Sequence, residues 1–194
     1  MKWEAAFELA MKLKVALAEG CERLEIVGSV KRHDKDDCGD IEILCIPDPG
    51  RPIPRFGDKV IFRNALEKTV VKMQEVGLIG KPKLNGDKLK KFPILNTGEI
   101  NPFYLELYIV KRDTWAIQNV IRTGPSEFSH RFVTNKSQGG LLPNDYKYIA
   151  GETKIQCKTQ AGYVTLTLQE EEDAIALLGR GWIEPKDRKL YINR

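Results

Sequence analysis

Two carboxylates lie two residues apart in one apolar segment, and a third lies in another. Asp40 and Glu42 belong to DIEILCI, residues 40–46, and Glu106 belongs to FYLELYIV, residues 103–110. In a β-strand, residues i and i+2 share a face, so these acids point away from the apolar residues between them. Neighbouring carboxylates repel one another unless a cation lies between them, and hard oxygen ligands suit Mg²⁺. The pattern is typical of a magnesium site, and equally of solvent-facing acids on a half-buried sheet.

A phosphate-binding pattern precedes the acids. Gly28 and Ser29 end one apolar segment, Arg32 follows in a basic pair, and Gly39 directly precedes Asp40. A Gly-Ser turn offers backbone N–H groups and a hydroxyl to a phosphate, and an arginine binds a phosphate in a fork. A glycine before the acid lets a polyphosphate approach the backbone closely. The spacing therefore favours a polyphosphate ligand next to the carboxylates.

The elements that must position these residues predict an α+β fold. Helical periodicity and β-rich runs predict helices over residues 3–18, 60–77, 114–121, 126–133 and 170–179, strands over residues 24–30, 40–46 and 103–110, and a hairpin over residues 145–167. From about residue 112 onward, short helical segments, a loop rich in Gly, Asn and Pro, and a hairpin replace the longer strand-like runs. We therefore expect one domain over residues 1–112 and a second over residues 113–194.

Composition restricts the class of protein. The chain has 194 residues, of which 42% are apolar, enough for a real core. No apolar run approaches the roughly 18 residues of a membrane span, so we expect no membrane partner and a cytoplasmic protein without a targeting signal. Four cysteines without CxxC or Cys/His spacing do not indicate a zinc site. The net charge is +4, and its positive residues cluster over residues 81–92 and 184–194, which suits a polyanionic partner.

The order of the motifs resembles a known enzyme family. GSVKR followed by GDIEIL resembles the nucleotidyltransferase signature of the DNA polymerase β superfamily. Within that superfamily the chain resembles family X DNA polymerases, through LELYIV (105–110), RTGPSEF (122–128), LLPNDYKYI (141–149) and EPKDR (184–188). The resemblance runs from about residue 20 to residue 189. It is closest to a minimal, compact viral form, because the lyase and helix-hairpin-helix domains of larger members have no room here.

The resemblance implies a fold and a reaction. Residues 1–112 would form a nucleotidyltransferase palm with a mixed β-sheet and flanking helices, and residues 113–194 a small C-terminal α+β subdomain that contacts DNA and the nascent base pair. The implied reaction adds nucleotides to a DNA 3′-hydroxyl and releases pyrophosphate, as in gap-filling DNA repair. Mg²⁺, or Mn²⁺ in its place, would be held by the catalytic acids Asp40, Glu42 and Glu106.

The resemblance also implies roles for other residues and a set of partners. The nucleotide would be bound by Gly28, Ser29, Arg32, Gly39, Arg122, Thr123, Gly124 and Ser129, and DNA by Lys88, Lys90 and Lys91. The expected partners are DNA, as a primer-template or gapped duplex, and a nucleoside triphosphate. The protein would act as a monomer in the cytoplasm of a bacterium or of a phage or viral host.

Several positions depart from the family pattern. Glu42 and Glu106 replace aspartates, and each extra methylene moves a carboxylate by about 1.5 Å. The pair Ile121-Arg122 replaces two aromatic residues, and Ser129 replaces an asparagine. Two alternatives therefore stay open: a catalytically degenerate DNA-binding module of the same fold, and a non-templated nucleotidyltransferase.

Overall fold

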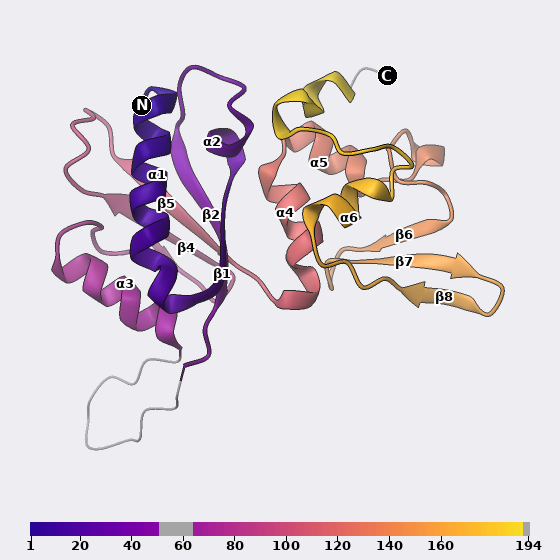
Figure 1. Cartoon of the computed structure of the whole chain (residues 1–194), viewed down its shortest axis with the longest axis horizontal. Coiled ribbons are helices and arrows are strands. Elements are labelled where there is room, and N and C mark those ends of the chain that lie inside the picture. The colour runs from indigo at the N-terminus through magenta and orange to yellow at the C-terminus, as the bar shows by residue number, and fades with distance from the viewer. Residues whose placement is uncertain (51–63, 192–194) are drawn as a thin grey trace. The chain divides into compact units, whose positions relative to one another are not determined.

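The computed structural model describes residues 1–50 and 64–191, and these form two compact units (Figure 1). The first unit comprises residues 1–26 and 35–110, and the second comprises residues 27–34 and 111–194. Both contain helices and strands, which confirms the predicted α+β class. In the described part of the chain, no helix is both long enough and apolar enough to span a membrane.

A mixed five-stranded sheet organises the first unit. Its order is β1-β2-β5-β4-β3, and its strands are β1 (Cys21–Val27), β2 (Asp40–Pro47), β3 (Leu84–Asn85), β4 (Leu89–Ile94) and β5 (Phe103–Ile109). β2 and β5 run parallel, whereas β4 runs antiparallel to both β5 and β3. The predicted strands at β2 and β5 are confirmed. β3 and β4 were not predicted, because lysines, glycine and asparagine in this segment resemble a basic loop.

Among the described residues, α-helices at 3–17 and 65–75 flank this sheet. α1 (Trp3–Leu17) and α3 (Ala65–Glu75) lie over one face of it (Figure 1). α1 buries apolar residues at helical spacing, namely Ala6, Ala10, Leu13 and Leu17. α3 begins after Asn64, whose side-chain oxygen accepts a hydrogen bond from the Glu67 backbone N–H at 3.1 Å. The predicted helix over 60–77 thus holds for its central part, and residues 60–63 lie outside the described residues.

The predicted alternation of β2 is confirmed over residues 40–43, whereas residues 43–46 are all buried. Ile41 and Ile43 are fully buried, whereas Asp40 and Glu42 are partly exposed. β5 repeats the pattern around Glu106, which is also partly exposed. Asp40, Glu42 and Glu106 therefore lie on one face of the sheet, and farther along β2 that face becomes buried at Leu44.

The second unit is built from helices and a small sheet. The main helices are α2 (Gly28–Arg32), α4 (Trp115–Thr123), α5 (Ser126–Phe132) and α6 (Glu171–Ala176), with 3-10 turns at Arg112–Thr114, Lys136–Gln138 and Pro185–Tyr191. The antiparallel strands β6 (Tyr146–Ile149), β7 (Lys154–Thr159) and β8 (Gly162–Thr165) form its sheet. Its core includes Val120, Phe128, Phe132, Ile155 and Ile175.

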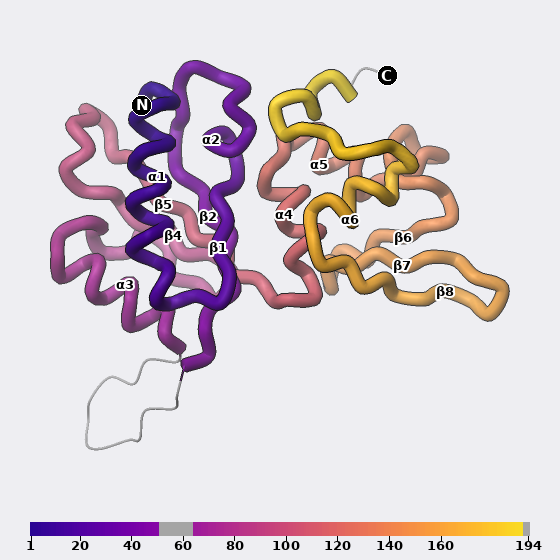
Figure 2. The backbone as a smooth tube through the Cα atoms, in the orientation of Figure 1, coloured from indigo at the N-terminus to yellow at the C-terminus, as the bar shows by residue number. Residues whose placement is uncertain are grey.

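Residues 27–34 differ from expectation in two ways. The strand predicted over 24–30 ends at Val27, and the segment from Gly28 onward turns into the short helix α2 before the chain enters β2 (Figure 2). The prediction of a strand through residue 30 is therefore wrong. The segment also belongs to the second unit, although the sequence placed it with residues 1–112. Ionic contacts with residues of the second unit, described below, account for this.

Candidate active site

The first unit brings two of the three predicted acids directly together. β2 and β5 pair in parallel with Glu42 opposite Glu106, and Asp40 lies opposite Tyr104. Because Asp40 and Glu42 are two residues apart, both point to the same face as Glu106. Like charges directly opposite each other destabilise a sheet, so this pairing needs a compensating cation or hydrogen-bond donor.

Lys91 supplies a positive charge at this place. β4 pairs with β5 so that Lys91 lies directly opposite Glu106. The Lys91 Nζ is 2.5 Å from the Glu106 Oε1, and the two side chains are only 28% and 14% exposed. We call Glu42, Glu106 and Lys91 the charged row, since they occupy facing positions on β2, β5 and β4. The hydrogen bond with Glu106, together with the charges of Glu106 and Asp40, raises the pKa of Lys91 despite its partial burial.

Tyr108 contacts both glutamates of the charged row. Its hydroxyl lies 2.7 Å from the Glu106 Oε2 and 3.2 Å from the Glu42 Oε1. A phenol carries one hydrogen, so it donates to one carboxylate at a time or shares the hydrogen between them. Both oxygens of Glu106 are therefore engaged, one by Lys91 and one by Tyr108.

The donor chemistry of these acids fits a divalent ion. Asp40, Glu42 and Glu106 offer only carboxylate oxygens, which Mg²⁺ and Mn²⁺ prefer. Within residues 1–50 and 64–191, no three His, Cys, Asp or Glu side chains already lie together in a metal-binding arrangement. The contacts of Glu106 with Lys91 and Tyr108 give a physical reason for this absence, because they direct both oxygens of this carboxylate to donors of the protein itself.

The second unit joins two of the predicted nucleotide-binding motifs. Gly28 opens α2 with φ of 68°, a conformation that favours glycine. At the other end of α2, the Arg32 Nη1 donates to the Thr123 carbonyl oxygen at 2.5 Å. Gly124 follows with φ of 68°, and a Cβ there would lie 3.2 Å from the Arg32 Nη1. Arg32, at the end of the helix that the Gly-Ser segment opens, therefore meets the Thr-Gly turn 91 residues farther along the chain, within one unit.

Asp34 holds the same arginine and was not predicted as a site residue. The Asp34 Oδ1 lies 3.3 Å from the Arg32 Nε, and the Asp34 Oδ2 lies 2.8 Å from the Lys189 Nζ. Burial by itself raises the pKa of Asp34, but the contact with Lys189 and the charge of Arg32 outweigh it, so the pKa is lowered. Asp34 remains ionised at neutral pH and fixes Arg32. Its sequence signal, one acid in a run of charges, was too weak to single it out.

A buried ionic network adjoins this arginine. Glu171 accepts a hydrogen bond from the Lys31 Nζ at its Oε2, at 2.9 Å, and its Oε1 lies 2.8 Å from the Arg188 Nη2. Lys31 also donates to the Asn119 Oδ1 at 3.0 Å, and Asn119 accepts from the Thr123 hydroxyl at 3.2 Å. The network thus links α2, α4 and α6 and explains why residues 27–34 belong to the second unit.

Three other residues predicted to bind the nucleotide, Ser129, Arg122 and Gly39, lie in different environments. Ser129 is 8% exposed, and its hydroxyl is bonded to the Ile121 and Pro125 carbonyl oxygens. It therefore closes the end of α4 and does not offer its hydroxyl hydrogen to a ligand in this arrangement. Arg122 is partly exposed, and its Nε lies 3.4 Å from the Gln118 Oε1. Gly39 is exposed, and a Cβ there would meet nothing within 4 Å.

The three lysines predicted to bind DNA have three different environments. Lys88 is exposed. Lys90 is 9% exposed and donates to the Asn85 Oδ1, and Lys91 pairs with Glu106. Only Lys88 is placed to meet a phosphate backbone without rearrangement. Lys90 and Lys91 belong to strand β4, whose alternation turns Lys90 inward and places Lys91 opposite Glu106.

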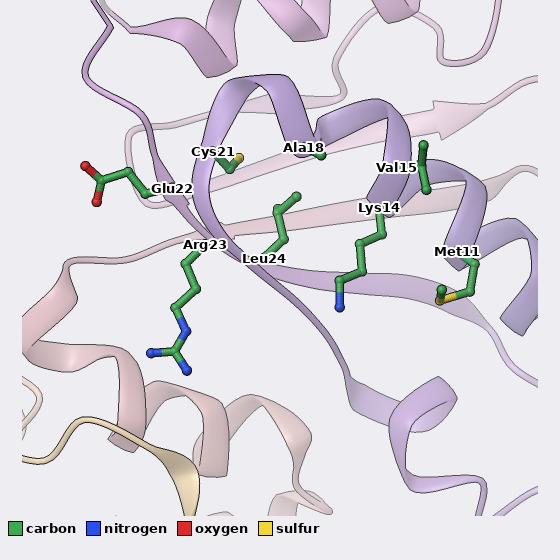
Figure 3. Close-up of a pocket in the computed structure, with 8 residues that line it drawn as sticks. All are labelled: Met11, Lys14, Val15, Ala18, Cys21, Glu22, Arg23 and Leu24. Carbon is green, nitrogen blue, oxygen red and sulfur yellow. The ribbon is translucent and has the colours of Figure 1, made fainter.

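An open pocket lies elsewhere on the first unit (Figure 3). It has a volume of about 380 Å³ and is lined by Met11, Lys14, Val15, Ala18, Cys21, Glu22, Arg23 and Leu24. None of the predicted site residues lines it. Its mainly apolar wall does not suit a triphosphate.

No model of a known protein family matches the chain, and a search of curated proteins finds no match. The residues themselves therefore carry the functional inference.

Proposed function

We propose that the chain is a nucleotidyltransferase that adds nucleotides to a DNA 3′-hydroxyl at a gap or primer end. One observation carries the proposal: Glu42 and Glu106 face each other on parallel neighbouring strands, with Asp40 on the same face. Three partly exposed acids on one face of a sheet cost electrostatic energy unless cations offset their charge. An activity that needs divalent ions beside a polyphosphate accounts for that cost.

A second observation supports the same reaction. Arg32 binds the Thr123 carbonyl oxygen, so the phosphate-binding motif and the Thr-Gly turn form one assembly within the second unit. Arg32 retains N–H groups beyond those directed at Thr123 and Asp34, since a guanidinium has five. We assign these, with the Gly28 and Ser29 segment, to the triphosphate.

The proposed chemistry divides among the chain's own residues. In the reaction, the bond from the primer 3′-oxygen to the α-phosphorus forms, the bond from that phosphorus to pyrophosphate breaks, and pyrophosphate leaves. Asp40, Glu42 and Glu106 would hold Mg²⁺ or Mn²⁺, which would supply Lewis acidity for the transfer. Glu106 accepts the primer proton. Arg32 orients the triphosphate, and Asp34 keeps Arg32 in place.

One observation favours a second candidate function, a non-catalytic DNA-binding module. Lys91 already neutralises Glu106, and glutamates occupy two of the three acid positions. A module that had lost its metal ions would show such a pair. Primer extension with Mg²⁺ and with Mn²⁺, on gapped and on single-stranded DNA, distinguishes the two candidates, because only an enzyme lengthens the primer. Extension of the single-stranded substrate would favour the non-templated alternative.

We expect DNA affinity to depend on salt through Lys88 and not through Lys90. Replacing Lys88 with Gln removes an exposed phosphate contact and should lower the slope of log K against log salt by about 0.9. Replacing Lys90 with Gln is the matched control, because this residue is 9% exposed and its ammonium donates to Asn85, and it should leave the slope unchanged. Fluorescence anisotropy with a gapped duplex across a salt series measures both. Equal slopes for Lys88→Gln and the unmodified protein would remove Lys88 from the interface.

We expect weak selection against ribonucleotides. Where the family has aromatic bulk before the Thr-Gly turn, this chain has Arg122, whose flexible guanidinium can move aside or donate to a 2′-hydroxyl. Since each lost 1.4 kcal/mol of steric clash removes about a factor of ten, the preference for deoxynucleotides should be about tenfold or less. Arg122→Phe should increase it, and Arg122→Leu, which removes the charge without aromatic bulk, should change it little. The ratio of kcat/KM values measures the preference, and a value above roughly a thousandfold in the unmodified protein contradicts this placement of Arg122.

A further inference from the structure

Strand pairing places the Lys91 ammonium within the charged row. Lys91 faces Glu106 across β4 and β5, and Glu106 faces Glu42 across β5 and β2. The position of Lys91 is therefore set by two consecutive registers of the sheet and not by a flexible loop. A lysine so fixed is a permanent positive charge beside the proposed metal ligands.

The contacts of Glu106 leave little room for a second cation. The Lys91 ammonium lies at Oε1, and the Tyr108 hydroxyl lies at Oε2. A divalent ion bound to the same carboxylate would lie within a few ångströms of the ammonium. Like charges at such distances repel strongly in a partly buried site. Ion binding by Glu106 and pairing with Lys91 therefore oppose each other.

Lys91 has a second favourable contact nearby. Its Nζ lies 4.7 Å from the centre of the ring of Tyr104, the residue opposite Asp40 in the pairing of β2 and β5. An ammonium over an aromatic ring gains electrostatic attraction without needing a carboxylate. A small rotation of the Lys91 side chain would thus free Glu106 while the ammonium keeps a partner.

We infer that Lys91 competes with the divalent cation for Glu106 and thereby sets the cation affinity of the carboxylates. This inference rests on the proposed function, which assigns these carboxylates to metal ions. Lys91 acts here as a positioning residue, because it works through Glu106 and does not contact the substrate.

The test is Mn²⁺ binding to the whole protein without DNA or nucleotide, measured by calorimetry. Lys91→Gln keeps a hydrogen-bond donor near Glu106 but removes the charge, and we expect it to bind Mn²⁺ at least about tenfold more tightly than the unmodified protein. Lys83→Gln is the matched control. The Lys83 Nζ lies over the same Tyr104 ring, at 5.3 Å, but Lys83 is not the residue paired with Glu106. The Mn²⁺ affinity of Lys83→Gln should therefore equal that of the unmodified protein.

The outcomes separate this inference from the reaction. Equal Mn²⁺ affinity in Lys91→Gln and the unmodified protein overturns the role of Lys91 and leaves the proposed reaction standing. Absence of Mn²⁺ binding in every variant, Lys91→Gln included, overturns both. A similar gain in affinity for Lys83→Gln would reduce the effect to general surface charge and also overturn the inference.

A measurement on the unmodified protein does not depend on the folding of any variant. Titration with Mg²⁺ should change the NMR signal of the Lys91 side chain as its ammonium leaves Glu106, while the signal of Lys83 changes little. A Lys91 signal that stays constant at saturating Mg²⁺ would contradict the inference.

Discussion

Replacing Asp40 with Asn is expected to lower kcat for nucleotide addition by about a thousandfold or more while leaving the fold intact. The amide has nearly the volume of the carboxylate, but it loses the negative charge and one anionic oxygen that hold the ion. Asp40 is partly exposed at the start of β2, so water reaches the amide that replaces the carboxylate. Single-turnover incorporation of one nucleotide, with circular dichroism of each variant, measures both parts.

A matched control separates a local effect from a general change in charge. Asp36→Asn makes the same substitution at an exposed position outside the strands and should retain full activity. If Asp40→Asn transferred nucleotides as fast as the unmodified protein, Asp40 would not be a metal ligand.

The second large effect concerns stability. Replacing Glu171 with Ala should lower the free energy of unfolding by about 3–5 kcal/mol, because it leaves a buried charge without its counter-ion. Arg188 is 0% exposed, and its guanidinium lies 5.5 Å from the centre of the Phe128 ring and 5.6 Å from that of Trp182. These rings do not replace a carboxylate. Burial already lowers the pKa of Arg188, and Glu171 is the main group that opposes this, with a smaller contribution from the charge of Glu184.

The neighbouring residue provides the control for this variant. Glu172 lies on the same helix but is exposed, so Glu172→Ala should change stability by less than about 0.5 kcal/mol. Thermal denaturation measures both, and the loss for Glu171→Ala corresponds to a fall of roughly 10 °C in Tm. Equal Tm values for the two variants would mean that Arg188 finds another partner or is hydrated.

The parts of the fold that follow from local periodicity could be predicted. The two-residue alternation of β2 and β5 and the helical spacing of α1 identify these elements, because each buries one face against the same core. The segment from Leu84 to Ile94 could not be recognised in this way. Its lysines resemble a solvated loop, and only pairing with β5 makes it a strand.

The site residues likewise fall into those that spacing within one strand reveals and those that only tertiary pairing brings together. Spacing within a strand places Asp40 and Glu42 on one face, and the same rule would have found Tyr108, two residues after Glu106. The pairing of Lys91 with Glu106 depends on the register between β4 and β5, which the sequence does not reveal. The contact of Arg32 with Thr123 likewise depends on tertiary packing across 91 residues.

The most direct measurement is the extension of a labelled primer at a one-nucleotide DNA gap by the unmodified protein. The account predicts a product longer by one nucleotide, with one pyrophosphate released per addition, that requires Mg²⁺ or Mn²⁺ and is lost in Asp40→Asn. A protein that binds the gapped DNA but forms no extended product with either ion, at enzyme concentrations above that of the DNA, would contradict it.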